Sequence, residues 1–247
     1  MILLLNDDGI ASPGLRSLYR ALRQHTRQAV LTVAPANERS GMSHAITIDR
    51  SLTAAARHEP GFFGFAVDGT PTDCAKLALD RLCNEPPRLV VSGINDGPNA
   101  GRSVFYSGTL GAAMEAAVAG HVGFAVSRRR GWATQDDAAE FAARWAARLL
   151  HTPDLAGCVV NLNLPATAAS TWLAPRVAKH GLGGFHERYR PVREGGRTVW
   201  ALHGAWVDTG SDDAVGLLSA GHPVFSLFRP DFNALDASSL FKLVESR

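Results

Sequence analysis

Two adjacent carboxylates, Asp7 and Asp8, follow a short apolar run at residues 1–5 and Asn6, and stand before Gly9. Neighbouring carboxylates repel each other unless a cation lies between them, and hard divalent ions take oxygen ligands of this type. The same residues also suit a plain turn, because Asp and Gly are common turn residues. Taken alone, this stretch leaves a metal site and a turn evenly matched.

Other loops offer chemistry of the same kind, because each combines small hydroxyl, amide or carboxylate side chains with glycine. That combination suits a hard cation and a phosphate together, with side-chain oxygens for the metal and exposed backbone amides for the anion. Each key residue also has a plainer interpretation: Ser40 and Asn95 as turn residues, and Ser107 or Thr109 as a helix N-cap. These loops are residues 37–44, 92–99 and 107–109.

The elements that must position these loops alternate between strand and helix patterns through the first two thirds of the chain. The run at residues 1–5 is short and wholly apolar, which indicates a strand buried on both faces in the centre of a parallel sheet. Ser12-Pro13 and Thr70-Pro71 are N-cap and first-position pairs that predict helix starts. An α/β fold with a mostly parallel sheet follows, and such sheets bind ligands at the carboxyl ends of their strands. Further strands are predicted at 30–34, 89–92, 122–126 and 158–164, and further helices at 109–120 and 134–150.

Several finer predictions follow from local patterns. Residues 46–49 and 62–67 suggest a hairpin-like pair, and the helix at 134–150 has one apolar stripe through Ala138, Phe141, Trp145 and Leu149. We interpret the chain as one domain, residues 1–247, with three parts. These are a core (1–175), an extension of short, irregular β segments that serves as an oligomerisation arm (176–207), and a C-terminal part (208–247) with a helix at 209–219, a strand at 224–227 and a helix at 236–244.

Composition narrows the class of protein. With 46% apolar residues in a chain of 247 there is ample material for a core, and a net charge of +2 without a dense Lys/Arg run favours neither nucleic acid nor a membrane surface. The three cysteines lack zinc or disulfide spacing, and no signal peptide or membrane-length apolar stretch is evident, so we expect a cytoplasmic protein. His44 is a general base or, more simply, a loop residue, and His180 and His186 are interpreted as structural. The run Arg128, Arg129 and Arg130 is interpreted as a solvated turn, with polyanion binding as the minor alternative.

Four stretches taken together closely resemble the SurE family of survival-protein 5′-nucleotidases. Each of them is weak alone, but they occur in order and span the first half of the chain almost without a break. They are LLLNDDGIASPGL (3–15), APANERSGMSHAIT (34–47), VDGTPTDCAKLAL (67–79) and VVSGINDGPNAGRSVFYSGTLGAAMEAAVAG (90–120). The second half of the chain departs from the usual family pattern.

The resemblance implies a Rossmann-like core and a metal-dependent phosphomonoesterase. It assigns one divalent ion per subunit, Mg²⁺ or Mn²⁺ with Ca²⁺ possible in crystals, to ligands at Asp7, Asp8, Ser40 and Asn95. It places Ser107, Gly108 and Thr109 at the phosphate, with Asn6 and Asn99 near the site, and it implies a homodimer or homotetramer with C-terminal exchange. The residues expected to carry catalysis are Asp7, Asp8 and Asn95.

The expected reaction is hydrolysis of nucleoside monophosphates, at the 5′ and possibly also the 3′ position. In haloacid-dehalogenase-type phosphatases an Asp at the position of Asn6 attacks phosphorus, and an amide cannot form an acyl phosphate, so a metal-activated water is the expected nucleophile. Two alternatives stay open. One is a phosphatase for another small phosphate or polyphosphate, and the other is a non-catalytic nucleotide sensor on the same fold.

Overall fold

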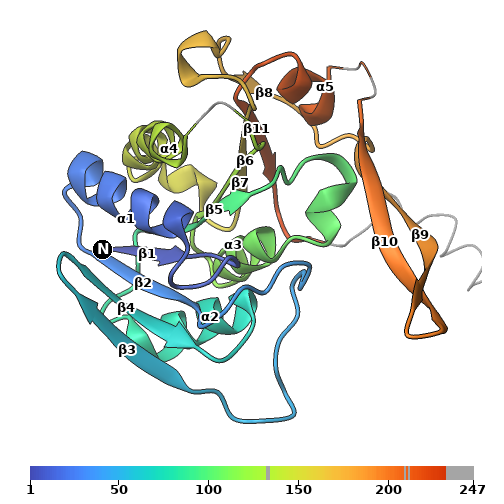
Figure 1. The fold of residues 1–247 in the computed structure, drawn as a ribbon. Helices are drawn as coiled ribbons and strands as arrows, with labels where there is room; N and C mark the ends of the chain where they lie inside the picture. Colours follow the sequence, from blue (N-terminus) through green and yellow to red (C-terminus); the bar gives the residue numbers. More distant parts are fainter. Residues whose placement is uncertain (132–133, 209, 211, 232–247) are drawn as a thin grey trace, which may run out of the picture.

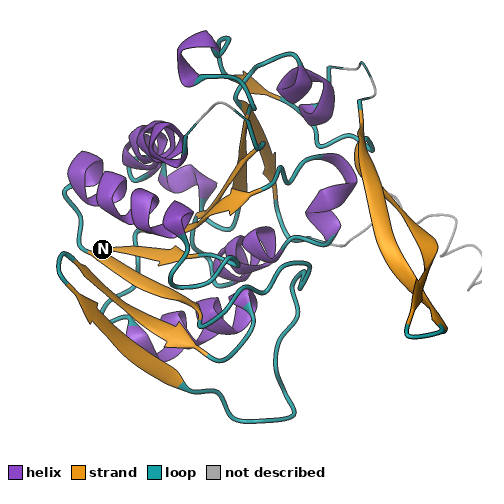
Figure 2. Cartoon of the chain, in the orientation of Figure 1, coloured by secondary structure: helices purple, strands orange, loops and turns teal. Residues whose placement is uncertain are grey.

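The computed structural model describes residues 1–131, 134–208, 210 and 212–231, and these form a three-layer α/β fold around a nine-stranded sheet (Figures 1 and 2). The sheet order is β3-β4-β2-β1-β5-β6-β7-β11-β8. Neighbours from β4 to β7 run parallel, as do β11 and β8, whereas the pairs β3–β4 and β7–β11 are antiparallel. The strands are β1 (Ile2–Leu5), β2 (Val30–Pro35), β3 (Ala54–Glu59), β4 (Phe62–Val67), β5 (Leu89–Asp96), β6 (Gly123–Arg128), β7 (Val159–Leu164), β8 (Arg176–Val177) and β11 (Val224–Phe228).

Strand β1 lies at the centre of the sheet, as its apolar sequence predicts. All four of its residues are buried, and alternate side chains enter different cores: Ile2 and Leu4 on one face, Leu3 and Leu5 on the other. Helices α1 (Pro13–Thr26) and α4 (Gln135–Leu149) cover the first face, and α2 (Pro71–Leu77) and α3 (Gly108–Val118) cover the second (Figure 1). The mostly parallel α/β sheet is therefore confirmed. Short helical segments complete the fold: η1 (Ala78–Leu82), η2 (Gly101–Phe105), η3 (Pro153–Leu155) and η4 (Ala169–Thr171).

Helix α4 is where it was expected, and the predicted stripe faces the core: Ala138 and Leu149 are buried in it, and Phe141 and Trp145 pack against it. Its buried face is made mainly of alanines, among them Ala139, Ala142 and Ala146, because this face packs directly against α1 and small side chains allow a close approach. Phe141 and Trp145 lie half-buried at the side of this interface, where they contact Trp172 and Phe225.

The predicted hairpin is also partly wrong, because residues 46–49 form no strand. Strand β4 pairs instead with β3, whose Ala54–Glu59 segment is exposed throughout and so carries no apolar alternation that could reveal it. Ile48 remains 86% exposed, and Thr47 is held by Asp73, which receives hydrogen bonds from both its backbone nitrogen and its hydroxyl.

The extension is regular rather than irregular. Strands β9 (Gly184–Glu194) and β10 (Arg197–Val207) pair along their whole length in an antiparallel hairpin that projects from the body of the protein (Figure 1). Its two-residue turn is Gly195-Gly196, both with positive φ, which is the geometry that matches the twist of paired strands. The Gly195-Gly196 pair is the sequence signal for this hairpin, and the prediction of short, irregular segments did not use it.

The C-terminal part supplies the expected helix and strand. Helix α5 (Ala214–Ser219) begins later than predicted because the Asp213 carboxylate caps it, accepting hydrogen bonds from the backbone of Val215 and Gly216. Strand β11 joins the central sheet beside β7. The helix predicted at 236–244 lies outside the described residues. Among helices in the described part of the chain, none combines the length and apolarity of a membrane span.

Candidate metal and phosphate site

The polar loops meet at the carboxyl edge of the sheet, around one open cavity of about 930 Å³ that we call the carboxylate cavity. The loops after β1, β2 and β5 and the start of α3 all contribute to its wall. Three of the predicted residues do not line it: Asn6, Gly108 and Thr109 lie behind the wall. The predicted site residues that line the cavity are Asp7, Asp8, Ser40, Asn95, Asn99 and Ser107.

Asp7 is a buried carboxylate held against the N-terminus of α3. The Thr109 hydroxyl donates a hydrogen bond of 2.6 Å to its Oδ1. Gly108 allows this approach, because a Cβ at that position would lie 3.0 Å from the Asp7 Cβ and 3.2 Å from its Oδ2. Burial raises the pKa of Asp7, against the opposing effect of the Thr109 hydrogen bonds. The structure therefore gives the Thr109 side chain a positioning role behind Asp7.

Asp8 lies beside Asp7 and is more open to the cavity. Burial and, after it, the charge of Asp7 raise the pKa of Asp8 to about 7, with smaller contributions from Glu38 and Asp96. A carboxylate surrounded by like charges binds a proton more readily than usual, and a bound cation would relieve the same repulsion. The cluster thus has the electrostatics of a cation site.

The neutral candidates, Ser40 and Asn95, present oxygen atoms to the same cavity. The Ser40 hydroxyl donates to Glu38 Oε1 at 2.7 Å, and the Asn95 amide nitrogen donates to the Gly97 carbonyl at 2.6 Å. Because the Asn95 nitrogen is engaged in this way, its amide oxygen is the atom left to act as a ligand. In the described residues no three His, Cys, Asp or Glu side chains are grouped as a metal site, so a bound ion would need these neutral oxygens as well as Asp7 and Asp8. Such an all-oxygen set fits Mg²⁺, Mn²⁺ or Ca²⁺.

Two predicted neighbours of the site support its loops. The Asn99 backbone nitrogen donates to Asn163 Oδ1, its side chain donates to Ser127, and its carbonyl accepts hydrogen bonds from Asn161 and Asn163, which fixes the loop after β5. Asn6 donates to the Gly9 carbonyl, and its buried Oδ1 lacks a hydrogen-bond partner among the described residues.

Ser107 caps α3, since its hydroxyl accepts a hydrogen bond from the Leu110 backbone. The capping and anion-site interpretations of this segment are therefore compatible. The cap uses the Ser107 oxygen, while the first backbone N–H groups and the positive end of the helix dipole are the features that attract an anion.

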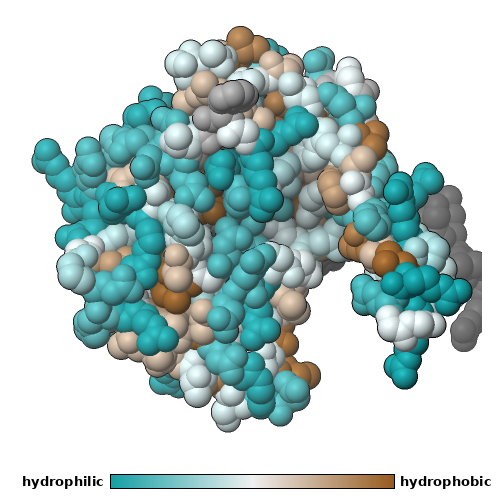
Figure 3. Space-filling view, in the orientation of Figure 1, coloured by the Kyte–Doolittle hydropathy of each residue, from teal (hydrophilic) through white to brown (hydrophobic). Residues whose placement is uncertain are grey.

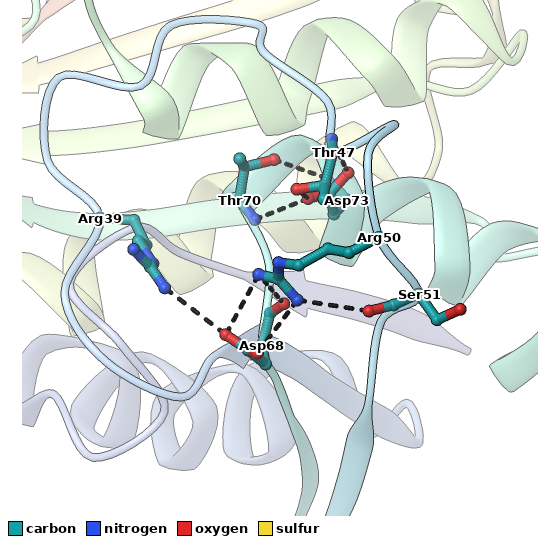
Figure 4. Close-up of polar contacts among 7 residues, drawn as sticks. All are labelled: Arg39, Thr47, Arg50, Ser51, Asp68, Thr70 and Asp73. Carbon is teal, nitrogen blue, oxygen red and sulfur yellow. Dashed lines mark hydrogen bonds and ion pairs between the residues drawn. The ribbon is translucent and has the colours of Figure 1, made fainter.

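The loop that carries Ser40, residues 36–53, is anchored at two points beside the site. Figure 4 shows Arg39 and Arg50 reaching the Asp68 carboxylate, and Thr47 and Thr70 reaching that of Asp73. Burial acts to raise the pKa of Asp73, but the hydrogen bonds from the two threonines outweigh it and lower that pKa. The Arg39 backbone N–H also donates a hydrogen bond to the Asp7 carbonyl, which connects the loop to the residues that follow β1.

His44 lies in this loop, outside the cavity that holds Asp7 and Asp8. Its Nε2 is 2.9 Å from Glu115 Oε2, and the same carboxylate accepts a hydrogen bond from Lys76. It does not line the carboxylate cavity, which agrees with the loop interpretation. His180 is half-buried, and burial lowers its pKa. Cys74 and Cys158 are buried free thiols, and Cys83 is a half-buried one.

Sequence reasoning missed part of the cavity wall. Asp96 forms ion pairs with Arg128 at 2.8 Å and Arg130 at 2.9 Å, and Arg129 lies over the ring of Trp206. The solvated-turn interpretation is therefore wrong for Arg128, which ends β6 with its side chain only 12% exposed, whereas the Arg130 side chain is 77% exposed. The signal was available, because these arginines follow the carboxyl end of a predicted strand. Cavity-lining residues that were not predicted include Glu38, Asp96, Tyr106, Arg129, Arg130, Phe185 and Trp206.

Replacing Thr109 by Val is expected to weaken Mn²⁺ binding by roughly tenfold, the lower end of the usual effect of removing a hydrogen bond to a metal ligand. The substitution keeps the shape of a fully buried side chain but removes the donor to Asp7. Calorimetric titration with Mn²⁺ measures the effect. Thr72→Val is the matched control, because the Thr72 hydroxyl is buried without a hydrogen-bond partner in the described residues. Equal Mn²⁺ affinities in the two variants would show that Thr109 does not support metal binding.

Comparison with known proteins identifies the family of this chain. The sequence model of the family described as "Survival protein SurE" matches residues 2–187. The chain is 42% identical to a protein of Nitratidesulfovibrio vulgaris (strain Hildenborough) named 5′-nucleotidase SurE, over 98% of this chain and 97% of that one. It is also 42% identical to the 5′-nucleotidase SurE of Rhodopirellula baltica, over 81% of each.

A solved structure supports the same relationship. The crystal structure of the SurE protein from Aquifex aeolicus matches the fold with a TM-score of 0.80 and 27% sequence identity, covering 99% of both chains. From the extent of the family match and the identity to full-length relatives, this chain belongs to the SurE family.

Proposed function

We propose that the protein is a metal-dependent phosphomonoesterase that hydrolyses nucleoside monophosphates to a nucleoside and phosphate. Relatives that cover nearly the whole chain bear the name 5′-nucleotidase. The observation that carries the proposal is the pair Asp7 and Asp8, crowded with further carboxylates in a cavity next to the N-terminus of α3. Repelling carboxylates favour a cation there, and the helix terminus favours a phosphate beside it.

Each residue of the cluster would have a distinct role. Asp7, Asp8, Ser40 and Asn95 would hold a divalent ion. When bound, that ion supplies Lewis-acid polarisation of the phosphoryl group and lowers the pKa of a water molecule. The backbone amides at the start of α3, with Ser107 at its cap, would stabilise charge on the phosphoryl oxygens.

Asp8 is the better placed of the two carboxylates to orient the attacking water and accept its proton. Asp7 is buried and already accepts the Thr109 hydroxyl, whereas Asp8 is open to the cavity.

The test is phosphate release from purine, pyrimidine and deoxynucleoside monophosphates, at the 5′ and 3′ positions, with Mn²⁺, with Mg²⁺ and with a chelator. Release that requires the metal and is lost with the chelator is the expected result. Full activity in the chelator would contradict the metal-dependent mechanism. Faster release from polyphosphate or another small phosphate would favour the alternative phosphatase, and tight nucleotide binding without turnover would favour the sensor.

We also propose that β9–β10 is an assembly arm of a homodimer or homotetramer, and that residues 1–175, 176–207 and 208–247 are parts of a single domain. A two-stranded hairpin is marginally stable alone in water. This hairpin exposes Tyr189, Trp200 and Leu202 on one face, apolar surface that a second copy would cover. Sedimentation of the full chain should give a dimer or tetramer, and a monomer at all concentrations would contradict this.

A further inference from the structure

The carboxylate cavity extends well beyond the space that a phosphate needs. Its volume of about 930 Å³ is within the range of sites that enclose a whole small-molecule ligand. Part of its wall comes not from the polar loops but from the hairpin and the segment after β6. That part of the wall holds two aromatic side chains, Phe185 and Trp206, and three charged ones, Arg129, Arg130 and Glu187.

The two aromatic residues form a pair at the base of the hairpin. Phe185 in β9 and Trp206 in β10 are cross-strand partners, so their side chains lie on the same face. Gly204 gives the Phe185 ring its place on that face, because a Cβ at Gly204 would lie 2.2 Å from the ring. Phe185 remains 40% exposed although it lines the cavity, so its ring offers open apolar surface to a ligand.

Trp206 is held from the side of the core. Its Nε1 donates a hydrogen bond of 3.1 Å to the Ser219 hydroxyl, and the Arg129 guanidinium lies 5.0 Å from the centre of its ring. Arg129 also donates to the same hydroxyl. Trp206 is therefore fixed in place by groups outside the hairpin, which preorganises this wall.

The base of the hairpin is also fixed to the loop that follows β5. The Arg102 backbone donates to the Gly183 carbonyl, and the Gly101 backbone donates to the His180 carbonyl. Figure 3 shows hydrophobic residues where the hairpin approaches the body of the protein and mostly hydrophilic residues toward its tip. The aromatic pair is therefore held in the same cavity as Asp7, Asp8 and Ser107 rather than on a free arm.

We infer that Phe185 and Trp206 form the nucleobase subsite of the carboxylate cavity, so that a base stacks against Phe185 while its phosphate lies at the carboxylates. This inference rests on the proposed function. A base has an apolar face on both sides, and base–aromatic stacking is strong and tolerant of base identity. A cavity with carboxylates and a helix terminus in one part and fixed aromatic rings in another matches the two chemical halves of a nucleoside monophosphate.

The test compares ligands with and without a base in variants of the pair. Phe185→Leu and Trp206→Leu keep apolar volume but remove the planar ring. Equilibrium binding of adenosine monophosphate, uridine monophosphate and ribose 5-phosphate is measured by calorimetry in the presence of Ca²⁺, and KM and kcat are measured with Mn²⁺. Phe63→Leu and Phe105→Leu are the controls, since neither ring lines the cavity and neither belongs to the hairpin.

The expected result is a loss of roughly tenfold in affinity, and a similar rise in KM, for the two nucleotides in Phe185→Leu, within the range for loss of one stacking contact. A smaller loss is expected in Trp206→Leu. Ribose 5-phosphate binding, kcat and the control variants should stay within twofold of the unmodified protein. A conservative Phe185→Tyr change should restore nucleotide affinity.

Equal losses for nucleotides and ribose 5-phosphate, or no loss in either variant, would overturn the inference. So would unmodified protein that binds ribose 5-phosphate as tightly as the nucleotides. The binding measurements separate failure of this inference from failure of the proposed function. Selective loss of nucleotide binding without any turnover in the unmodified protein would support the subsite and contradict the hydrolase.

Discussion

Replacement of Asp8 by Asn is expected to lower metal-dependent phosphate release by more than about a hundredfold, the upper end of effects seen when only the partner of a metal ligand is removed. The change takes away one of the two carboxylates proposed to bind the ion, and the group proposed to orient the attacking water. Phosphate release at saturating Mn²⁺, together with a calorimetric titration of Mn²⁺, measures both losses.

The same variant should keep its fold, for a reason that depends on pH. Burial and the neighbouring Asp7 raise the pKa of Asp8 to about 7, so the folded, metal-free protein holds this proton more tightly than the unfolded chain does. Stability of the metal-free protein should therefore fall as pH rises from about 4 to about 7, and an uncharged Asn should remove that contribution.

Thermal unfolding without metal at pH 8 is thus expected to occur at the same or a higher temperature in Asp8→Asn than in the unmodified protein. Asp154→Asn is the matched control, since Asp154 is an exposed carboxylate outside the cavity. Unmodified turnover in Asp8→Asn would refute the role of Asp8, and a large drop in its unfolding temperature would show that Asp8 is a structural residue.

Replacement of Gly111 by Ala is expected to damage the site from a distance. Alanine favours a helix over glycine by about 1 kcal/mol when nothing interferes. Here, however, the new Cβ would lie 2.1 Å from the Ser43 carbonyl oxygen and 3.1 Å from the His44 Cα. Both are backbone atoms of the 36–53 loop, so the loop must move, and Ser40 and Glu38 move with it. Mn²⁺ affinity and phosphate release should fall together with the unfolding temperature.

Ser40→Ala distinguishes loop displacement from simple loss of stability. This change removes only a hydroxyl on an exposed stretch of the loop, so it should weaken Mn²⁺ binding without lowering the unfolding temperature. Undisturbed Mn²⁺ affinity in Gly111→Ala would show that the packing of the loop on α3 does not position the metal ligands.

The residues that local patterns predicted best are those placed by one strand and its own loop. The apolar run of β1 predicts its central position, and the rule on the carboxyl ends of parallel strands then brings Asp7, Asp8 and Asn95 to one edge. The capping pairs Ser12-Pro13 and Thr70-Pro71 likewise set the starts of α1 and α2.

What could not be predicted depends on contacts between distant parts of the chain. Nothing near Thr109 in the sequence reveals that its hydroxyl faces Asp7, 102 residues earlier. The aromatic wall has the same origin, because Phe185 and Trp206 meet only once the hairpin forms, and Trp206 is fixed by Ser219 and Arg129 from other elements. Strand β3 was missed for a different reason: as an exposed edge strand it needs no apolar alternation.

The most direct measurement of the central claim is anomalous diffraction from crystals soaked in Mn²⁺. The account predicts one strong peak per subunit in the carboxylate cavity, with oxygen atoms of Asp7, Asp8, Ser40 and Asn95 at about 2.0 to 2.6 Å from the ion. A cavity without a peak at saturating Mn²⁺, or an ion bound by other residues, would contradict it.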